Sequence, residues 1–171
     1  DIIIQRNFVN HFCDVLHDGG GIYTFASGSD AAPGPTYTNR IVRNNICMNG
    51  IGAWLGTTAT GPDVAGIFND GRTMNVSILN NTVFNSAMDG IYCNNPAGMT
   101  IRGNVLYNNV RDIAFMKYSW GTISNLVIKR NISFNANSAS RNIHYINGKI
   151  TSPTMALLQT DVQALGSIDS N

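Results

Sequence analysis

Short apolar runs, each interrupted by asparagine, recur along the whole chain. In each copy an aliphatic residue is followed three positions later by Asn, and four positions after that by Asn or His. The copies are Ile4…Asn7…His11, Val42…Asn45…Asn49, Ile78…Asn81…Asn85, Ile101…Asn104…Asn108 and Ile128…Asn131…Asn135. From Asn7 to Asn131 the successive leading Asn residues are 38, 36, 23 and 27 positions apart. A repeat of this length indicates a solenoid in which each copy is one structural unit.

Each unit also contains a second short apolar segment. These segments are Gly21-Ile22-Tyr23, Gly66-Ile67-Phe68, Gly90-Ile91-Tyr92, Asp112-Ile113-Ala114 and Asn142-Ile143-His144. A unit of about 23 residues cannot close a core alone, but stacked parallel units can. A leucine-rich repeat would need a leucine framework, and a sandwich would need hairpin turns every 8 to 12 residues. We therefore predict an all-β fold, a right-handed parallel β-helix of about five to six coils, with the hand taken from the crossover rule.

The alternation within one copy predicts which side chains face the core. Ile78 and Val83 should point inward, whereas Asn80 and Thr82 should point outward. Because neighbouring strands lie about 4.8 Å apart, Asn residues at one position in successive coils can hydrogen-bond in a ladder. Asn also tolerates the left-handed conformation that a tight corner requires.

Two insertions and one helical segment interrupt the repeat. Residues 26–38 and 55–64 are rich in Gly, Pro, Ser and Thr, so we expect loops that rise on the same flank and wall a binding site. Ser152-Pro153 before an apolar stretch, with Gly166 after it, predicts a short helix at about 153–165. We interpret residues 1–171 as one β-helix domain, with coils over 2–150, from a longer chain.

Composition limits the possible partners. The chain of 171 residues has 23 Asn against 21 charged residues, a net charge of +1, and no apolar run of 18 residues. These features argue against a nucleic-acid face and a membrane span. Cys13, Cys47 and Cys93 lack metal-ligand or redox spacing and are predicted to be small buried side chains. No metal or cofactor is expected, and the oligomeric state is left open.

Several segments resemble bacterial carbohydrate-active β-helix proteins, in particular β-helical glycoside hydrolases of the xylosidase and fucosidase type. The similar segments are Asp18-Gly19-Gly20-Gly21-Ile22-Tyr23, residues 39–45, Gly66-Ile67-Phe68-Asn69-Asp70-Gly71 and residues 76–85. The resemblance implies a secreted or cell-surface protein that acts on a polysaccharide or oligosaccharide. It also implies Asp18 and Asp70 as acid/base and nucleophile, with Asn69 at a position where the family has an acid.

Glycoside hydrolysis needs two carboxyl groups about 5 Å apart for retention or about 6.5 to 9.5 Å apart for inversion. If Ile22 and Ile67 are equivalent, a straight strand would place Asp18 and Asp70 seven steps, about 23 Å, apart. Either the glycines fold the chain back, or Asp63, which stacks one coil from Asp18, is the partner. Asp89 and Asp112 lie near the same column, where an Asp before a corner also has a purely structural use.

Further candidates would contact a sugar rather than react with it. Aromatic rings can stack on sugars, and the candidate binding residues are His17, Tyr23, Trp54, Asn69 and Trp120, with Tyr118 as a further exposed aromatic. Three alternatives stay open at this point. They are a carbohydrate-binding solenoid without catalysis, a polysaccharide lyase or epimerase using Lys117 and His144, and a structural spike or adhesin segment.

Overall fold

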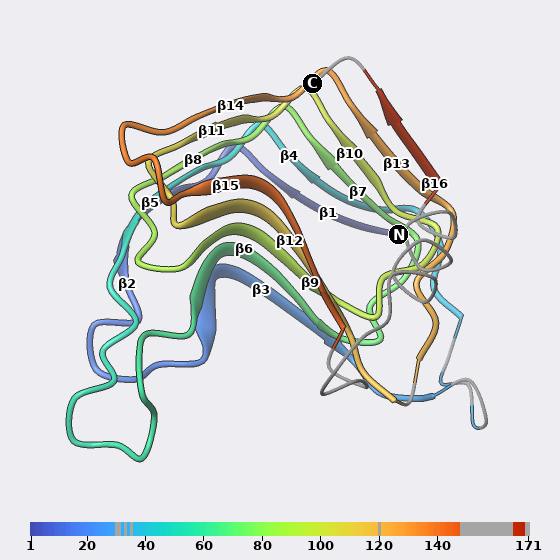
Figure 1. Ribbon diagram of the computed structural model, residues 1–171. Helices are drawn as coiled ribbons and strands as arrows, with labels where there is room; N and C mark the ends of the chain where they lie inside the picture. Colours follow the sequence, from blue (N-terminus) through green and yellow to red (C-terminus); the bar gives the residue numbers. More distant parts are fainter. Residues whose placement is uncertain (30–31, 33, 35, 120, 148–165, 170–171) are drawn as a thin grey trace.

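Three parallel β-sheets wind around one axis (Figure 1). The computed structural model describes residues 1–29, 32, 34, 36–119, 121–147 and 166–169. Sheet A contains, in spatial order, β1 (Ile2–Gln5), β4 (Arg40–Arg43), β7 (Val76–Leu79), β10 (Thr100–Arg102), β13 (Leu126–Lys129) and β16 (Gly166–Asp169). Sheet B contains β2 (Phe8–Phe12), β5 (Ile46–Gly50), β8 (Thr82–Phe84), β11 (Val105–Tyr107) and β14 (Ile132–Phe134). Sheet C contains β3 (Gly19–Ala26), β6 (Val64–Gly71), β9 (Asp89–Asn94), β12 (Arg111–Lys117) and β15 (Arg141–Asn147).

The register of the sheets follows the sequence repeat. Sheet A aligns Ile4, Val42, Ile78, Ile101 and Ile128 in one column, and sheet C aligns Ile22, Ile67, Ile91, Ile113 and Ile143. Five coils each contribute one strand to every sheet, and β16 adds a sixth strand to sheet A. The all-β parallel solenoid is confirmed. Its right-handedness stays a prediction, and the helix expected at 153–165 lies outside the described residues.

The inward positions of the coils form one continuous apolar core. Ile78 and Val83 are fully buried, while Asn80 is exposed and Thr82 half-buried, as predicted. Cys47 and Cys93 belong to the same core, and burial raises the pKa of each thiol to about 12. Cys13 is only partly buried, and all three cysteines are free thiols.

A ladder of asparagine side chains runs through the corner between sheets A and B. The side-chain Nδ2 of Asn7 donates to Asn45 Oδ1 at 2.9 Å, Asn45 to Asn81 at 2.9 Å, Asn81 to Asn104 at 3.0 Å and Asn104 to Asn131 at 2.9 Å. The backbone N–H of each donating residue bonds the same acceptor oxygen. Since the members from Asn45 onward are almost fully buried, each unpaired amide would carry a desolvation cost.

A second, more exposed ladder lies at the corner between sheets B and C. Asn49 donates to Asn10, Asn85 to Asn49 and Asn108 to Asn85, at 2.9 to 3.1 Å. In the sequence repeat, His11 and Asn135 stand at the positions equivalent to Asn49, Asn85 and Asn108. His11 shares the positive-φ corner of Asn49, but the adjacent Asn10 provides the acceptor. Asn135 instead donates to Asp112 Oδ2.

The strands of sheet C bend sharply near their beginnings (Figure 1). Near the start of these strands Gly21, Gly66 and Gly90 occupy one position in successive coils. A Cβ atom on Gly66 would overlap the Val83 side chain of sheet B, so only glycine allows the two sheets to approach this closely. The straight-strand separation of Asp18 and Asp70 therefore does not apply.

The two inserted loops lie at different corners, which corrects the expectation that they share one flank. The first joins β3 to β4, at the corner between sheets C and A, and the second joins β5 to β6, at the corner between sheets B and C. The expectation failed because it placed both loops by coil number, whereas their position within a coil decides the corner. The loops consequently flank the two ends of the sheet C strands.

Candidate functional site

The outward face of sheet C gathers most of the candidate side chains. Along one outward column the rings of Tyr23, Phe68 and Tyr92 follow one another, with centroid separations of 5.1 and 4.8 Å. Phe68 and Tyr92 are buried, and Tyr23 is 45% exposed. The aromatic column is thus buried at Phe68 and Tyr92 and ends at Tyr23, whose ring is accessible to solvent.

Asp18 and Asp63 lie side by side at the start of this face. The Asp18 backbone N–H donates to the Asp63 carbonyl at 2.6 Å, and the next residues, Gly19 and Val64, are paired in register. Asp18 is exposed with a φ of 60°, whereas Asp63 is half-buried. Burial, and after it the charge of Asp18, raises the pKa of the Asp63 carboxyl above its usual range, although the charges of Arg111 and His17 act to lower it.

Asp70 lies near the end of β6, the strand that begins directly after Asp63, and its carboxylate accepts three hydrogen bonds. Its Oδ1 accepts from the Gly71 backbone at 2.5 Å and from Asn94 Nδ2 at 2.6 Å, and its Oδ2 accepts from the Tyr23 hydroxyl. This set of donors fits a carboxylate that acts only as an acceptor. Burial and the bond to Asp70 raise the pKa of Tyr23, so its hydroxyl remains a donor.

Asp89 and Asp112 have internal partners. Asp89 is fully buried and forms a two-pronged ion pair with Arg111, at 2.5 and 2.6 Å. Burial outweighs the lowering effect of Arg111 and raises the pKa of Asp89 to about 6. Asp112, also buried, accepts from Asn109, Ser133 and Asn135. Both residues therefore have the structural use that an Asp at a corner allows.

A cavity of about 290 Å³ opens beside Asp63. It is lined by His17, by Ala59 to Pro62 of the second inserted loop, by Asp63 and by Met88. His17 and Asp63 thus share one cavity, and this loop forms one of its walls. Trp54 is half-buried earlier in the same loop, where its carbonyl accepts from Thr57.

One of the predicted binding residues is not part of this face. Asn69 is fully buried on the inward side of β6, where its Oδ1 accepts from Thr24 and its Nδ2 contacts Cys93. It is therefore separated from the outward carboxylates by the sheet itself. Trp120 lies outside the described residues.

The residues named for a lyase lie toward the opposite edge of sheet C. His144 is half-buried, and burial together with the charges of Arg111 and Arg141 lowers its pKa. Its Nδ1 is 3.5 Å from an Arg141 nitrogen. Lys117 lies three residues further along β12 than Ala114, which is the partner of His144.

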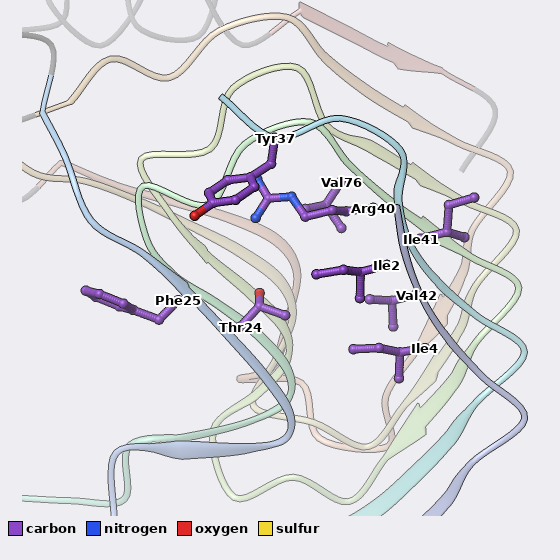
Figure 2. Close-up of a pocket in the computed structure, with 9 residues that line it drawn as sticks. All are labelled: Ile2, Ile4, Thr24, Phe25, Tyr37, Arg40, Ile41, Val42 and Val76. Carbon is purple, nitrogen blue, oxygen red and sulfur yellow. The ribbon is translucent and has the colours of Figure 1, made fainter. Parts of the chain in front are cut away.

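A larger cavity, of about 350 Å³, lies at the end of the solenoid that β1 and β3 form. Figure 2 shows Ile2, Ile4 and Val42 on one side, Thr24 and Phe25 on the other, and the Arg40 side chain beside the Tyr37 ring. The Arg40 guanidinium lies 4.6 Å from that ring centroid. Apolar inward residues dominate its lining, and none of the candidate carboxylates reaches it.

Sequence reasoning missed several partners on sheet C, although a signal was present. Tyr23, Phe68 and Tyr92 each follow the repeating Ile, so the aromatic column was readable from the alignment of copies. Asp89 and Arg111 each precede that Ile by two positions, which places them opposite each other. Asn94 had no comparable signal.

Across the described residues no group of three or more His, Cys, Asp or Glu side chains could hold a metal ion, and no helix is long and apolar enough to cross a membrane. Comparisons with protein-family models, curated proteins and solved structures found no match. The geometry of sheet C therefore carries the functional argument by itself.

Proposed function

We propose that the chain is a glycoside hydrolase that acts on a polysaccharide or oligosaccharide at the outward face of sheet C, with Asp18 and Asp63 as its two carboxyl groups. The observation that carries the proposal is the pairing of these residues in adjacent coils, beside a cavity and an aromatic column. A secreted or cell-surface location belongs to the same proposal, since the substrate is an extracellular polymer.

The environments of the two carboxyl groups suggest their roles. Asp63 is the general acid, because burial and the Asp18 charge favour its protonated form. Asp18, which is exposed, is the partner carboxylate. The backbones of adjacent strands are about 4.8 Å apart, so two carboxyl groups that project in the same direction from them would lie near the separation of about 5 Å that retaining enzymes use. Retention of anomeric configuration is therefore the expected outcome.

Other residues of the face would position the sugar. Tyr23 presents an exposed ring for stacking and is held by Asp70, so we assign Asp70 to orienting this platform. His17 lines the cavity next to Asp63 and would contact a sugar hydroxyl there. Trp54, in the same loop as the cavity wall, is a second candidate platform.

The direct test is hydrolysis of xylo- and fuco-oligosaccharides by the chain and by its Asp63→Asn and Asp18→Asn variants. Each substitution should reduce kcat at least about 100-fold, since it removes one of the two reacting carboxyl groups. Asp14→Asn is the matched control, because Asp14 is exposed and outside this face. Product configuration read by NMR should show retention.

The pH profile separates a catalytic from a structural role for Asp63. Activity should fall as the pH rises through the raised pKa of Asp63, because the acid then loses its proton. In the Asp18→Asn variant the residual activity should fall at a lower pH, because the neighbouring charge that raises this pKa is gone. Oligosaccharide binding without turnover in the unmodified chain would instead favour a carbohydrate-binding solenoid.

A further inference from the structure

A row of cations lies along the corner between sheets A and B, at the top of Figure 1. The outward column that ends the sheet A strands contains Gln5, Arg43, Leu79, Arg102 and Lys129 in register. The next residue of each coil forms the corner itself. Together the two columns hold Arg6, Arg43, Arg102, Lys129 and Arg130, which are five of the 11 lysines and arginines in the chain. We call these five residues the basic ridge.

The charges of the basic ridge are largely unneutralised. Arg6, Arg102, Lys129 and Arg130 form no side-chain hydrogen bond or ion pair within the described part of the chain, and Arg43 bonds the neutral Gln5 through Nε at 2.8 Å. The backbone of Asp169 pairs beside Lys129 at one end of the ridge. Between Gln5 and Lys129 the two columns contain no acidic residue.

Two of these arginines occupy backbone conformations that disfavour them. The corner residues Arg6 and Arg130 have φ values of 57° and 54°, and the equivalent positions in the three middle coils are Asn44, Asn80 and Gly103. Asn and Gly tolerate this conformation, whereas a long side chain adds strain. Arginine at these two corners is therefore not explained by local backbone preference, and strained positions tend to collect at functional sites.

We propose that the basic ridge binds a linear polyanionic glycan that carries carboxylate or sulfate groups and lies along the solenoid axis. Successive coils are separated by about 4.8 Å, so the stacked strands display the cations at multiples of this spacing, with a break at Leu79 in the middle coil. Such a row matches a linear polymer with repeated charges better than a single small anion. The ridge lies on a different corner from sheet C, so the inference does not depend on the proposed hydrolysis.

The surroundings of the ridge favour a glycan over nucleic acid. Single-stranded nucleic acid is held by aromatic platforms, and the two ridge columns contain no aromatic residue. A net charge of only +1 is also unusual for a chain that binds a duplex. Guanidinium groups pair well with carboxylate and phosphate oxygens alike, so the lack of aromatic platforms and the low net charge are what favour the glycan.

The test measures binding of the full chain to sulfated dextran and to polygalacturonate, with neutral dextran and a DNA duplex as comparison probes. The variant Arg6→Gln/Arg102→Gln/Arg130→Gln should bind the anionic glycans about tenfold or more weakly. Binding by the unmodified chain should weaken steeply as salt is added, and the triple variant should show a shallower dependence. The two anionic probes distinguish sulfate from carboxylate recognition.

A control with the same change in net charge separates the ridge from the overall charge. Ser119→Glu/Ala136→Glu/Ser138→Glu removes three units of charge at exposed positions away from the ridge, and should retain more than half of the affinity. Leu79 occupies the ridge column in the middle coil, where the ridge has no cation. Leu79→Lys should therefore increase the affinity for the anionic glycans about threefold or more. A gain cannot arise from unfolding.

Three results would overturn the inference. They are equal affinity for neutral and sulfated dextran, an equal loss in the triple variant and its charge-matched control, and no gain from Leu79→Lys. Tighter binding of the DNA duplex than of either anionic glycan would assign the ridge to nucleic acid instead. Each result is independent of whether the chain hydrolyses oligosaccharides.

Discussion

Asparagine has three different uses in neighbouring residues of this chain, set by where each one faces. Asn80 turns the corner with a φ of 52°, Asn81 is a buried member of the inner ladder, and Asn85 belongs to the exposed ladder. The side chain of Asn81 donates to Asn104 and Val42 and accepts from Asn45. Removing Asn81 leaves buried polar groups without partners, whereas removing Asn85 leaves only exposed groups that water can bind.

Asn81→Ala should therefore lower the free energy of unfolding by about 3 kcal/mol, because it orphans buried groups on both neighbouring coils. Asn80→Gly should change the free energy of unfolding by less than about 1 kcal/mol, since glycine accepts the same φ. Denaturant unfolding of the two variants provides the comparison. Equal losses would contradict the assignment of the inner ladder.

The buried pair of Asp89 and Arg111 predicts a pH-dependent variant. Arg111→Gln leaves the Asp89 carboxylate buried without its cation and should cost about 3–5 kcal/mol at pH 8. The pKa of Asp89 is raised in the folded protein, so the stability linked to its protonation is present at low pH and is lost as the pH rises from about 4 through about 6.

Without Arg111 this folded-state pKa rises further, so the loss of stability should be smaller at pH 5 than at pH 8. Unfolding titrations at the two pH values measure the difference. Arg102→Gln removes an exposed arginine that has no side-chain partner among the described residues, and should change the free energy of unfolding by less than about 0.5 kcal/mol at both pH values. A loss of the same size at both pH values would show that Asp89 is not the titrating group.

At the scale of elements, the bend of sheet C decides where the candidate site lies. The Gly66 backbone approaches Val83 of sheet B, and the strands of sheet C bend near their beginnings, so that Asp63 precedes β6 and Asp70 lies near its far end. Gly21, Gly66 and Gly90 occupy one position in three successive coils. A sequence pattern alone shows these glycines but not the direction in which the strand turns.

Gly66→Ala should destabilise the protein by about 2 kcal/mol or more, because the added methyl group overlaps Val83 and the core cannot absorb it. Gly61→Ala is the matched control, since a Cβ there meets no atom within 4 Å. Thermal unfolding of both variants gives the answer. An unchanged midpoint in Gly66→Ala would mean that the two sheets approach each other less closely.

Some elements of the fold could be predicted from the sequence and others could not. The coils were predictable because Asn at 7, 45, 81, 104 and 131 marks one position in each turn, and a buried ladder tolerates little else. The placement of the inserted loops was not predictable, because the number of the coil that contains an insertion does not say at which corner of that coil the insertion lies. The stacking of Asp18 beside Asp63 was predictable once Ile22 and Ile67 were aligned.

At the scale of the whole molecule, charge and stability are both distributed along the axis. The net charge of +1 gave no indication of the basic ridge, because its cations are far apart in the sequence and become neighbours only through the register of the strands. The end coil is also less protected than the middle ones. Ile2 is 56% exposed although it lines the end cavity, while Val76, two coils further along the same column, is 2% exposed.

Stability in a solenoid is approximately a sum over units and their interfaces, so the unpaired coil at one end should open most readily. We expect backbone amides of β1, β2 and β3 to exchange with solvent at least about tenfold faster than those of β7, β8 and β9. Hydrogen exchange followed by mass spectrometry measures this gradient. Uniform protection across the coils would argue for a single cooperative unit.

The adjacency of Asp18 and Asp63 underlies the account, and a cross-link tests it most directly. In a Cys13→Ser background, Asp18→Cys/Asp63→Cys should oxidise to an intramolecular disulfide, because neighbouring strands hold the two residues within bridging distance. Asp14→Cys/Asp70→Cys, which joins positions on different parts of the coil, should stay reduced under the same conditions. A reduced Asp18→Cys/Asp63→Cys pair in the folded protein would contradict the proposed site.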